Sequence, residues 1–247
     1  MFLKFKINEA EIKRFVPSKR LDLLFSEILD KRLKASTRSY SPYLQYLKGK
    51  VDVLKNETID VARLENDWFP QINADIFLSH SHADVDLVQY FSNWLSKELD
   101  LTTFIDSDVW GYKDNLIKEL TGSMSNKKQI IRCVDNINII LSTALTKMIS
   151  ETPVFIFLES DNSVENDYST YSPWIYNELL MTTLIATKKE KMFSASQEAL
   201  LEKYAHFEYD VEHILRGFPS LSFRQLSEWK KMYDLNDKNA ITLLNNI

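Results

Sequence analysis

One carboxylate stands on an otherwise apolar helical stretch. Ser172 followed by Pro173 pairs an N-cap residue with proline at the first helical position, which predicts a helix beginning here. In that register Trp174, Glu178, Met181 and Ile185 follow one another at spacings of three or four residues, so Glu178 shares a face with three apolar residues. A buried carboxylate costs free energy unless it is hydrogen-bonded or its pKa is raised, and acid–base chemistry uses such environments. Glu178 is therefore a candidate functional residue. The alternative is a half-exposed glutamate at the edge of the apolar stripe.

Two loops that follow short apolar runs are rich in polar side chains. The first is Ser79–Asp84 (SHSHAD), and the second is Asp106–Tyr112 (DSDVWGY). Ligands of open α/β sheets bind beyond the carboxyl ends of the strands, so these loops and the segment after Leu158 are candidate binding positions. The alternative for both loops is turn and cap chemistry. Asp84 would then be the N-cap of the next helix, and Trp110 or Tyr112 would pack back onto the core.

The predicted elements that position these loops alternate between strands and helices along the chain. After Pro70, short apolar runs alternate with helical periodicity, which predicts a parallel sheet with helical crossovers. The predicted strands cover residues 75–79, 101–105 and 153–158, with weaker candidates near 192–193 and 206–209. The predicted helices cover residues 85–99, 141–149, the segment from Ser172 onward, and parts of 223–244. We expect this last segment to cover the outer face of the sheet.

The amino-terminal part of the chain has a different charge balance. Residues 1–50 carry 12 Lys and Arg against 5 Asp and Glu, a net charge of +7, whereas the remaining residues carry −12. This asymmetry indicates two modules or an electrostatic docking face. Apolar residues at helical spacing predict an amphipathic helix over residues 18–33. Residues 1–72 are thus predicted to be a basic helical region serving as a sensor or an oligomerisation arm. A nucleic-acid-binding arm fits the interleaved leucines less well.

The composition excludes several kinds of site. The four glycines, Gly49, Gly111, Gly122 and Gly217, are too far apart for a G-x-G-x-x-G turn or a P-loop. Cys133 is the single cysteine, which excludes an intramolecular disulfide and a thiolate metal cage. The four histidines form no H-E-x-x-H motif. We therefore expect no metal site, and any nucleotide must be held without a glycine-rich cradle.

The sequence shows no targeting or membrane-spanning segment. Charges interrupt the apolar run at the amino terminus before it reaches the roughly 7 to 15 residues of a signal-peptide core. No stretch approaches the ~18 to 20 apolar residues that cross a bilayer. The expected location is cytoplasmic, without attachment to a membrane.

Three of the segments above together resemble the Toll/interleukin-1 receptor (TIR) domain. Residues 75–84 (DIFLSHSHAD) look like its opening strand and loop. Phe104–Asp106 (FID) with Gly111 is similar to its second strand and BB loop. Ser172–Glu178 (SPWIYNE) matches its helix motif, including the Trp-x-x-x-Glu spacing. The resemblance covers about residues 73–215.

The resemblance implies an α/β fold. It would be a flavodoxin-like sheet of five parallel strands flanked by helices, with residues 216–247 as a helical extension packed on the TIR domain. Residues 1–72 match no part of the family motif. The 46 residues between Asp106 and Pro153 exceed the usual family length. That excess leaves the limits of the BB loop, and with them the roles of Trp110 and Tyr112, open.

The family's chemistry would place Glu178 at the reaction centre. Many bacterial and plant members cleave NAD+, and the resemblance assigns the catalytic role to this glutamate. Breaking the nicotinamide–ribose bond has oxocarbenium character and releases neutral nicotinamide, so a carboxylate beside the ribose suffices without a metal or resident cofactor. The substrate-binding residues that we infer with it are Ser79, His80, Asp106, Trp110 and Trp174.

These observations predict an NAD+ glycohydrolase, an enzyme that yields nicotinamide and ADP-ribose or a cyclic ADP-ribose signal. The resemblance also implies a role in antiphage defence. The expected partners are NAD+, further copies of the chain associating through the TIR domain, and a downstream effector that responds to a cyclic product. One alternative is a non-catalytic TIR–TIR adaptor or host-signalling mimic. Another is a nucleoside hydrolase or deoxyribosyltransferase on a similar sheet.

Overall fold

The chain forms two compact units. The first comprises Met1–Phe15, Gln71–Val109 and Ser142–Ile247, and the second comprises Val16–Pro70 and Trp110–Leu141. The computed structural model describes residues 2–15, 61–109, 117–118, 120–122, 124–165, 167–186, 208–235, 239–245 and 247.

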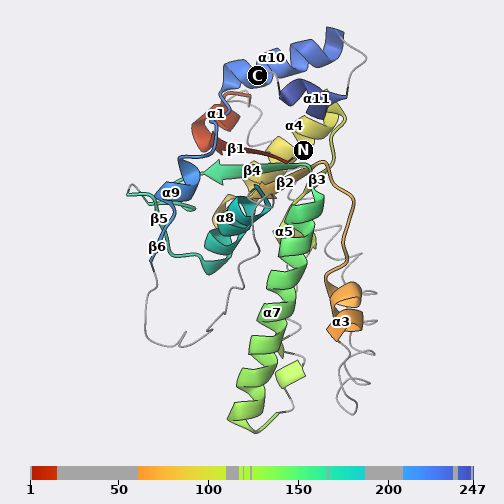
Figure 1. The fold of residues 1–247 in the computed structure, drawn as a ribbon, viewed down its shortest axis with the longest axis vertical. Helices are drawn as coiled ribbons and strands as arrows, with labels where there is room; N and C mark the ends of the chain where they lie inside the picture. Colours follow the sequence, from red (N-terminus) through yellow and green to blue (C-terminus); the bar gives the residue numbers. More distant parts are fainter. Residues whose placement is uncertain are drawn as a thin grey trace. The chain divides into compact units, whose positions relative to one another are not determined.

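The first unit is built on a parallel sheet (Figure 1). The strands of this sheet are β1 (Leu3–Asn8), β2 (Ile76–Ser79), β3 (Thr103–Phe104) and β4 (Val154–Glu159). Its helices are α1 (Glu9–Lys13), the 3-10 helix η1 (His82–Asp84), α4 (Val85–Leu99), α5 (Asp106–Val109), α8 (Pro173–Ala186), α9 (Glu212–Leu215), α10 (Phe223–Leu235) and α11 (Ala240–Leu244). The carboxyl-terminal end of α7 (Lys127–Glu151) also belongs to it. A second sheet pairs β5 (Ser169–Thr170) with β6 (Tyr209–Asp210) in antiparallel fashion.

The strand order is β1-β4-β2-β3, and all neighbours are parallel. Val154 of β4 lies opposite Leu3 on one side and Ile76 on the other. The run β3-β2-β4 follows the first part of the flavodoxin-like order, in which the first strand lies between the second and the third. The predicted α/β class is confirmed as a four-stranded parallel sheet flanked by helices. The described residues contain no fifth strand of this sheet.

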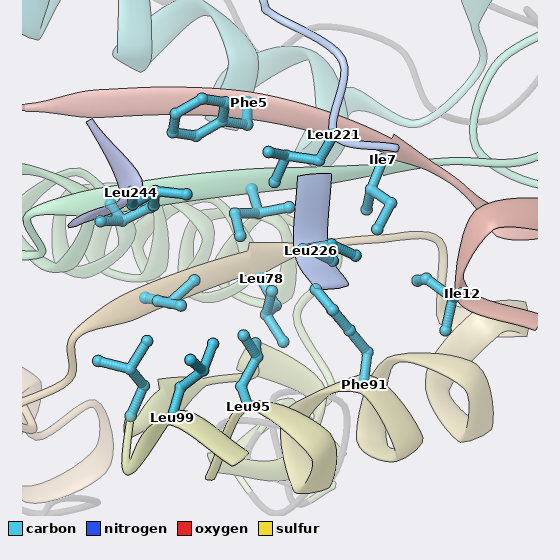
Figure 2. Packing of buried hydrophobic residues seen from close by; sticks show 14 of the residues in the cluster. Phe5, Ile7, Ile12, Leu78, Phe91, Leu95, Leu99, Leu221, Leu226 and Leu244 are labelled. Carbon is cyan, nitrogen blue, oxygen red and sulfur yellow. The ribbon is translucent and has the colours of Figure 1, made fainter. Parts of the chain in front are cut away.

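One face of the sheet packs against α4, α10 and α11 (Figure 2). The strands contribute alternate residues to this apolar cluster: Phe5, Ile7, Ile76, Leu78, Val154, Ile156 and Leu158. The helices contribute Val88, Phe91, Leu95, Leu99, Leu226, Trp229, Leu243 and Leu244. Trp229 is completely buried, and its Nε1–H donates to the Ala240 carbonyl at 2.8 Å, which ties α10 to α11. The helices of segment 223–244 therefore cover this face of the sheet.

The opposite face is aromatic. The ring centroid of Phe77 lies 5.4 Å from that of Phe155 and 5.2 Å from that of Phe104. Phe218 contacts Phe155 edge-on at 6.0 Å between centroids. Successive strand residues point to opposite faces, so Ser79 shares this face with Phe77. Figure 1 shows α8 on the side of the sheet away from α10 and α11.

The edge strand β1 corrects the prediction that residues 1–72 are helical. Leu3, Phe5 and Ile7 alternate with two lysines, and Phe5 and Ile7 are buried. This strand adds in parallel to β4 and belongs to the first unit. The alternation of apolar and charged residues is typical of a half-buried strand, and the pairing with β4, about 150 residues away, places this strand in the sheet. The helix predicted over residues 18–33 lies outside the described residues.

Other predictions have mixed outcomes. The helix over residues 85–99 is confirmed as α4, and the helical stretch 141–149 is part of the longer α7. The strand candidate at 206–209 is wrong as a member of the main sheet, because β6 pairs with β5 instead. The candidate at 192–193 lies outside the described residues. The domain limits at residues 73 and 215 stay predictions.

In the second unit the structure describes α3 (Val61–Trp68) and the amino-terminal part of α7. Its buried apolar residues within the described ranges are Leu64, Phe69, Leu120, Ile137, Ile140 and Leu141. Across the described parts of both units, no helix combines the length and apolar character needed to traverse a bilayer.

Candidate active site

The start of α8 fixes the position of Glu178. The helix begins at Pro173, and the Ser172 hydroxyl accepts a hydrogen bond from the backbone N–H of Ile175 at 3.3 Å, as an N-cap residue does. The predicted helix start is thereby confirmed. Glu178 lies in the second turn and is only 3% exposed. The alternative of a half-exposed glutamate at the edge of the stripe is wrong.

The Glu178 carboxyl group meets the carboxyl end of β2. Ser79 is the last residue of that strand and is buried. Its hydroxyl donates to Glu178 Oε2 at 2.6 Å, in a fully buried hydrogen bond. The contact joins residues 99 positions apart. It places the candidate carboxylate at the end of a central strand, the position where α/β sheets bind ligands.

The surroundings of Glu178 disfavour its charged form. Burial is the largest cause that raises the pKa of Glu178 well above its ordinary value of 4.5. The Asp106 carboxylate raises this pKa further, while the hydrogen bond from Ser79 acts in the opposite direction. Within the described residues, no Lys or Arg forms an ion pair with Glu178. Glu178 therefore holds a proton more tightly than an exposed glutamate does.

His80 is held from both sides of its ring. The Nδ1 atom lies 3.1 Å from the Leu78 carbonyl oxygen, and Nε2 lies 3.1 Å from Ser107 Oγ. A carbonyl oxygen can only accept, so Nδ1 carries a proton. In the neutral ring Nε2 is then the acceptor, and the Ser107 hydroxyl is the donor. The Asp106 carboxylate lies 3.9 Å from Nδ1, and the His80 side chain is 1% exposed.

The structure brings three of the five predicted binding residues together with Glu178. Ser79, His80 and Asp106 come together with Glu178 at the ends of β2 and β3 through the contacts described above. Trp174 lies one turn before Glu178 on α8 and is partly exposed. Trp110 lies outside the described residues.

A second buried carboxylate ties the loop after β2 to the loop after β4. Asp84 is 6% exposed and occupies the predicted N-cap position of α4, but its side chain makes no cap hydrogen bond there. Its Oδ2 accepts from Ser160 Oγ at 2.5 Å, and its Oδ1 accepts from the Asn162 side-chain amide at 2.7 Å. The Ser163 hydroxyl donates to the Leu158 carbonyl at 3.0 Å, which braces the same loop.

Two parts of this edge were identified from the sequence only as segments, without the contacts that they make. Ser107 lay in a loop already singled out, but only its contact with His80 distinguishes it from neighbouring polar residues. The segment 160–163 (SDNS) lies within the stretch after Leu158 that was predicted as a candidate binding position because it follows an apolar strand. Its partner Asp84 lies 76 positions from Ser160, and no local pattern reveals that pairing.

The arrangement can provide acid–base or electrostatic chemistry. A buried carboxyl group with one hydrogen-bond donor can bind a proton, and in its charged form it stabilises a nearby cation. The described residues contain no group of three or more His, Cys, Asp or Glu that could hold a metal ion. Comparisons of the chain with protein-family models, with curated proteins and with solved structures gave no match.

Proposed function

We propose that this chain is an NAD+ glycohydrolase of TIR type in which Glu178 is the catalytic carboxylate. The observation that carries the proposal is the burial of Glu178 at the carboxyl end of β2, with Ser79 Oγ 2.6 Å from its Oε2. The TIR-like motifs around residues 75–84, 104–106 and 172–178 support the same assignment. The antiphage role rests on this resemblance alone.

The charge of the substrate suits this carboxyl group. The nicotinamide ring of NAD+ is cationic, and the ribose carbon becomes cationic as the ring leaves. An opposite charge nearby favours the ionised form of a buried carboxyl group. We therefore expect NAD+ binding to release a proton from Glu178. The resulting carboxylate stabilises the developing positive charge in surroundings that hold little water.

Ser79 has a positioning role in this mechanism. Its hydroxyl donates to one carboxylate oxygen of Glu178. That hydrogen bond orients the carboxylate and lowers the pKa of Glu178, so it favours the ionised form that the reaction requires. Trp174, one turn before Glu178, supplies a flat surface for a planar ring.

The direct test is to incubate purified protein with NAD+ over a series of protein concentrations and to separate the products by chromatography. We expect nicotinamide release that increases with self-association. Glu178→Gln should reduce it by about 10²- to 10³-fold, the usual loss when one electrostatic contact to the transition state is removed. Glu159→Gln is the matched control. It makes the same substitution in a glutamate at the end of β4, which pairs with Lys6 at 3.1 Å and not with Ser79.

Three results would contradict the proposal. Equal nicotinamide release by the wild-type protein and by Glu178→Gln would remove Glu178 from the chemistry. No release at any protein concentration, with self-association intact, would favour the non-catalytic adaptor instead. Consumption of free nucleosides in place of NAD+ would indicate a nucleoside hydrolase or a deoxyribosyltransferase.

A further inference from the structure

The polar groups beside Glu178 differ in their access to solvent. The His80 side chain is 1% exposed, and its Nδ1 is occupied by the Leu78 carbonyl. Its remaining nitrogen, Nε2, faces the hydroxyl of Ser107, 3.1 Å away. Ser107 is only partly buried. The Ser107 hydroxyl is therefore the outer end of a short hydrogen-bonded path that leads to a buried imidazole.

The ring is set up to take a proton along this path. Since Nδ1 carries the proton donated to Leu78, the neutral ring accepts at Nε2. An imidazolium formed there would have the Asp106 carboxylate 3.9 Å from its Nδ1. A base, a group that holds it in one tautomer and a nearby negative charge are the parts that general base catalysis uses.

The same Asp106 links this path to Glu178. Its carboxylate faces His80 from α5 and also acts electrostatically on Glu178 of α8. Ser107 adjoins Asp106 in the chain, and His80 adjoins Ser79, the partner of Glu178. The hydroxyl–imidazole pair and the catalytic carboxylate thus belong to one site at the ends of β2 and β3.

We propose that Ser107 and His80 form a proton relay that activates the nucleophile attacking the ribose, an inference that rests on the proposed NAD+ cleavage. The water oxygen bonds to the anomeric carbon while the bond from that carbon to the nicotinamide nitrogen breaks. The electron pair of the broken bond goes to the ring, which leaves neutral. The water proton passes to Ser107 Oγ, and the Ser107 hydroxyl proton passes to His80 Nε2. The imidazolium later returns this proton to solvent by the same route.

Azide provides a test because it attacks as an anion and has no proton to lose. The protein is incubated with NAD+ at a fixed azide concentration, and two product classes are measured. One is ADP-ribosyl azide, and the other is ADP-ribose, the product of attack by water. Their ratio reports on nucleophile activation. It does not depend on the fraction of folded protein, since both classes come from the same active molecules.

We expect Ser107→Ala to raise the ratio of azide product to ADP-ribose by about 100-fold, the lower end of what general base catalysis contributes. His80→Gln should raise it similarly, because glutamine cannot take up a proton. Ser107→Thr keeps a hydroxyl and should stay near the wild-type ratio.

The possible outcomes separate the two proposals. If the wild-type protein cleaves NAD+ and Ser107→Ala leaves the product ratio unchanged, the relay is wrong and the glycohydrolase proposal stands. This conclusion holds even where Ser107→Ala slows both product classes equally, because the serine then acts only on structure. If the wild-type protein releases no nicotinamide, both proposals fail together.

Discussion

Glu178 and Asp84 are buried carboxylates at the same edge of the sheet, and they differ in their hydrogen-bond partners. Asp84 accepts from Ser160 at one oxygen and from Asn162 at the other. Glu178 accepts from Ser79 alone among the described side chains. When both oxygens of a buried carboxylate accept hydrogen bonds, the group is fully paired and holds the surrounding segments together. A carboxyl group with one donor retains the capacity to interact with a cation that arrives from outside.

The largest expected effect on stability comes from removing Asp84, the carboxylate with hydrogen-bond donors at both oxygens. Asp84→Ala removes two hydrogen bonds between the loops after β2 and β4. It should lower the free energy of unfolding by about 3 kcal/mol, as when one partner of a buried charged network is removed. Chemical denaturation measures the change. Asp161→Ala, at an exposed position of the same loop, is the control and should stay within about 0.5 kcal/mol of wild type. Equal losses of unfolding free energy in Asp84→Ala and Asp161→Ala would show that the Asp84 hydrogen bonds do not hold the two loops together.

Removing the serine partner of Asp84 should destabilise the protein more than removing the serine partner of Glu178. Ser160→Ala removes a hydrogen bond to the Asp84 carboxylate and should cost about 2 kcal/mol, as expected for a charged acceptor. Ser79→Ala removes a bond to a carboxyl group that favours its neutral form, so about 1 kcal/mol is expected. Denaturation of the two variants side by side at pH 7 measures this difference. A larger loss for Ser79→Ala would reverse the comparison.

Glu178→Gln should stabilise the protein by on the order of 1 kcal/mol at pH 7, in the manner of substitutions that relieve a functional site. Because burial raises the pKa of Glu178 in the folded state, the native protein binds a proton more tightly than the unfolded chain. Stability contributed by Glu178 is therefore present at low pH and is lost as the pH rises from about 4.5 through the native pKa.

The gain from Glu178→Gln should accordingly vanish near pH 4 and grow as the pH rises. Unfolding free energies measured across the pH range test this sign. A gain that is greatest in acid would mean that the folded protein favours the charged form of Glu178.

The smallest effect is a displacement of the pH dependence of NAD+ cleavage. The proposed reaction needs ionised Glu178, so the rate of NAD+ cleavage should rise with pH as this group loses its proton. Ser79→Ala removes the hydrogen bond that lowers the pKa of Glu178, and the rise should move to higher pH. Rates of nicotinamide release at a series of pH values measure the displacement. An unchanged profile would show that the Ser79 contact does not tune the carboxyl group.

Local signals in the sequence were sufficient for much of the fold and for the central residue of the site. Three strands, the helix α4 and the start of α8 were marked by apolar runs, helical periodicity and the Ser172–Pro173 cap. Glu178 was identifiable because a carboxylate interrupts an apolar helix face. Its degree of burial was not, since periodicity alone leaves open how closely the neighbouring strand approaches.

What the sequence did not reveal depends on pairings between distant segments. β1 carries an alternation of apolar and charged residues, but nothing in these six residues identifies its partner β4, about 150 residues away. The hydrogen bond between Asp84 and Ser160 joins two loops that the sheet brings together only after folding. Each of these contacts is chosen by tertiary structure, so residue patterns in a short window carry no trace of it.

The parallel pairing of Leu3 with Val154 has a consequence for biosynthesis. A ribosome adds about 5 to 20 residues per second, so the first strand emerges roughly 8 to 30 s before its neighbour exists. During that interval its backbone hydrogen-bonding groups have no partner and are open to association with other nascent chains. Lys4 and Lys6 alternate with the apolar residues of this strand and protect it, because charges discourage aggregation between exposed edges.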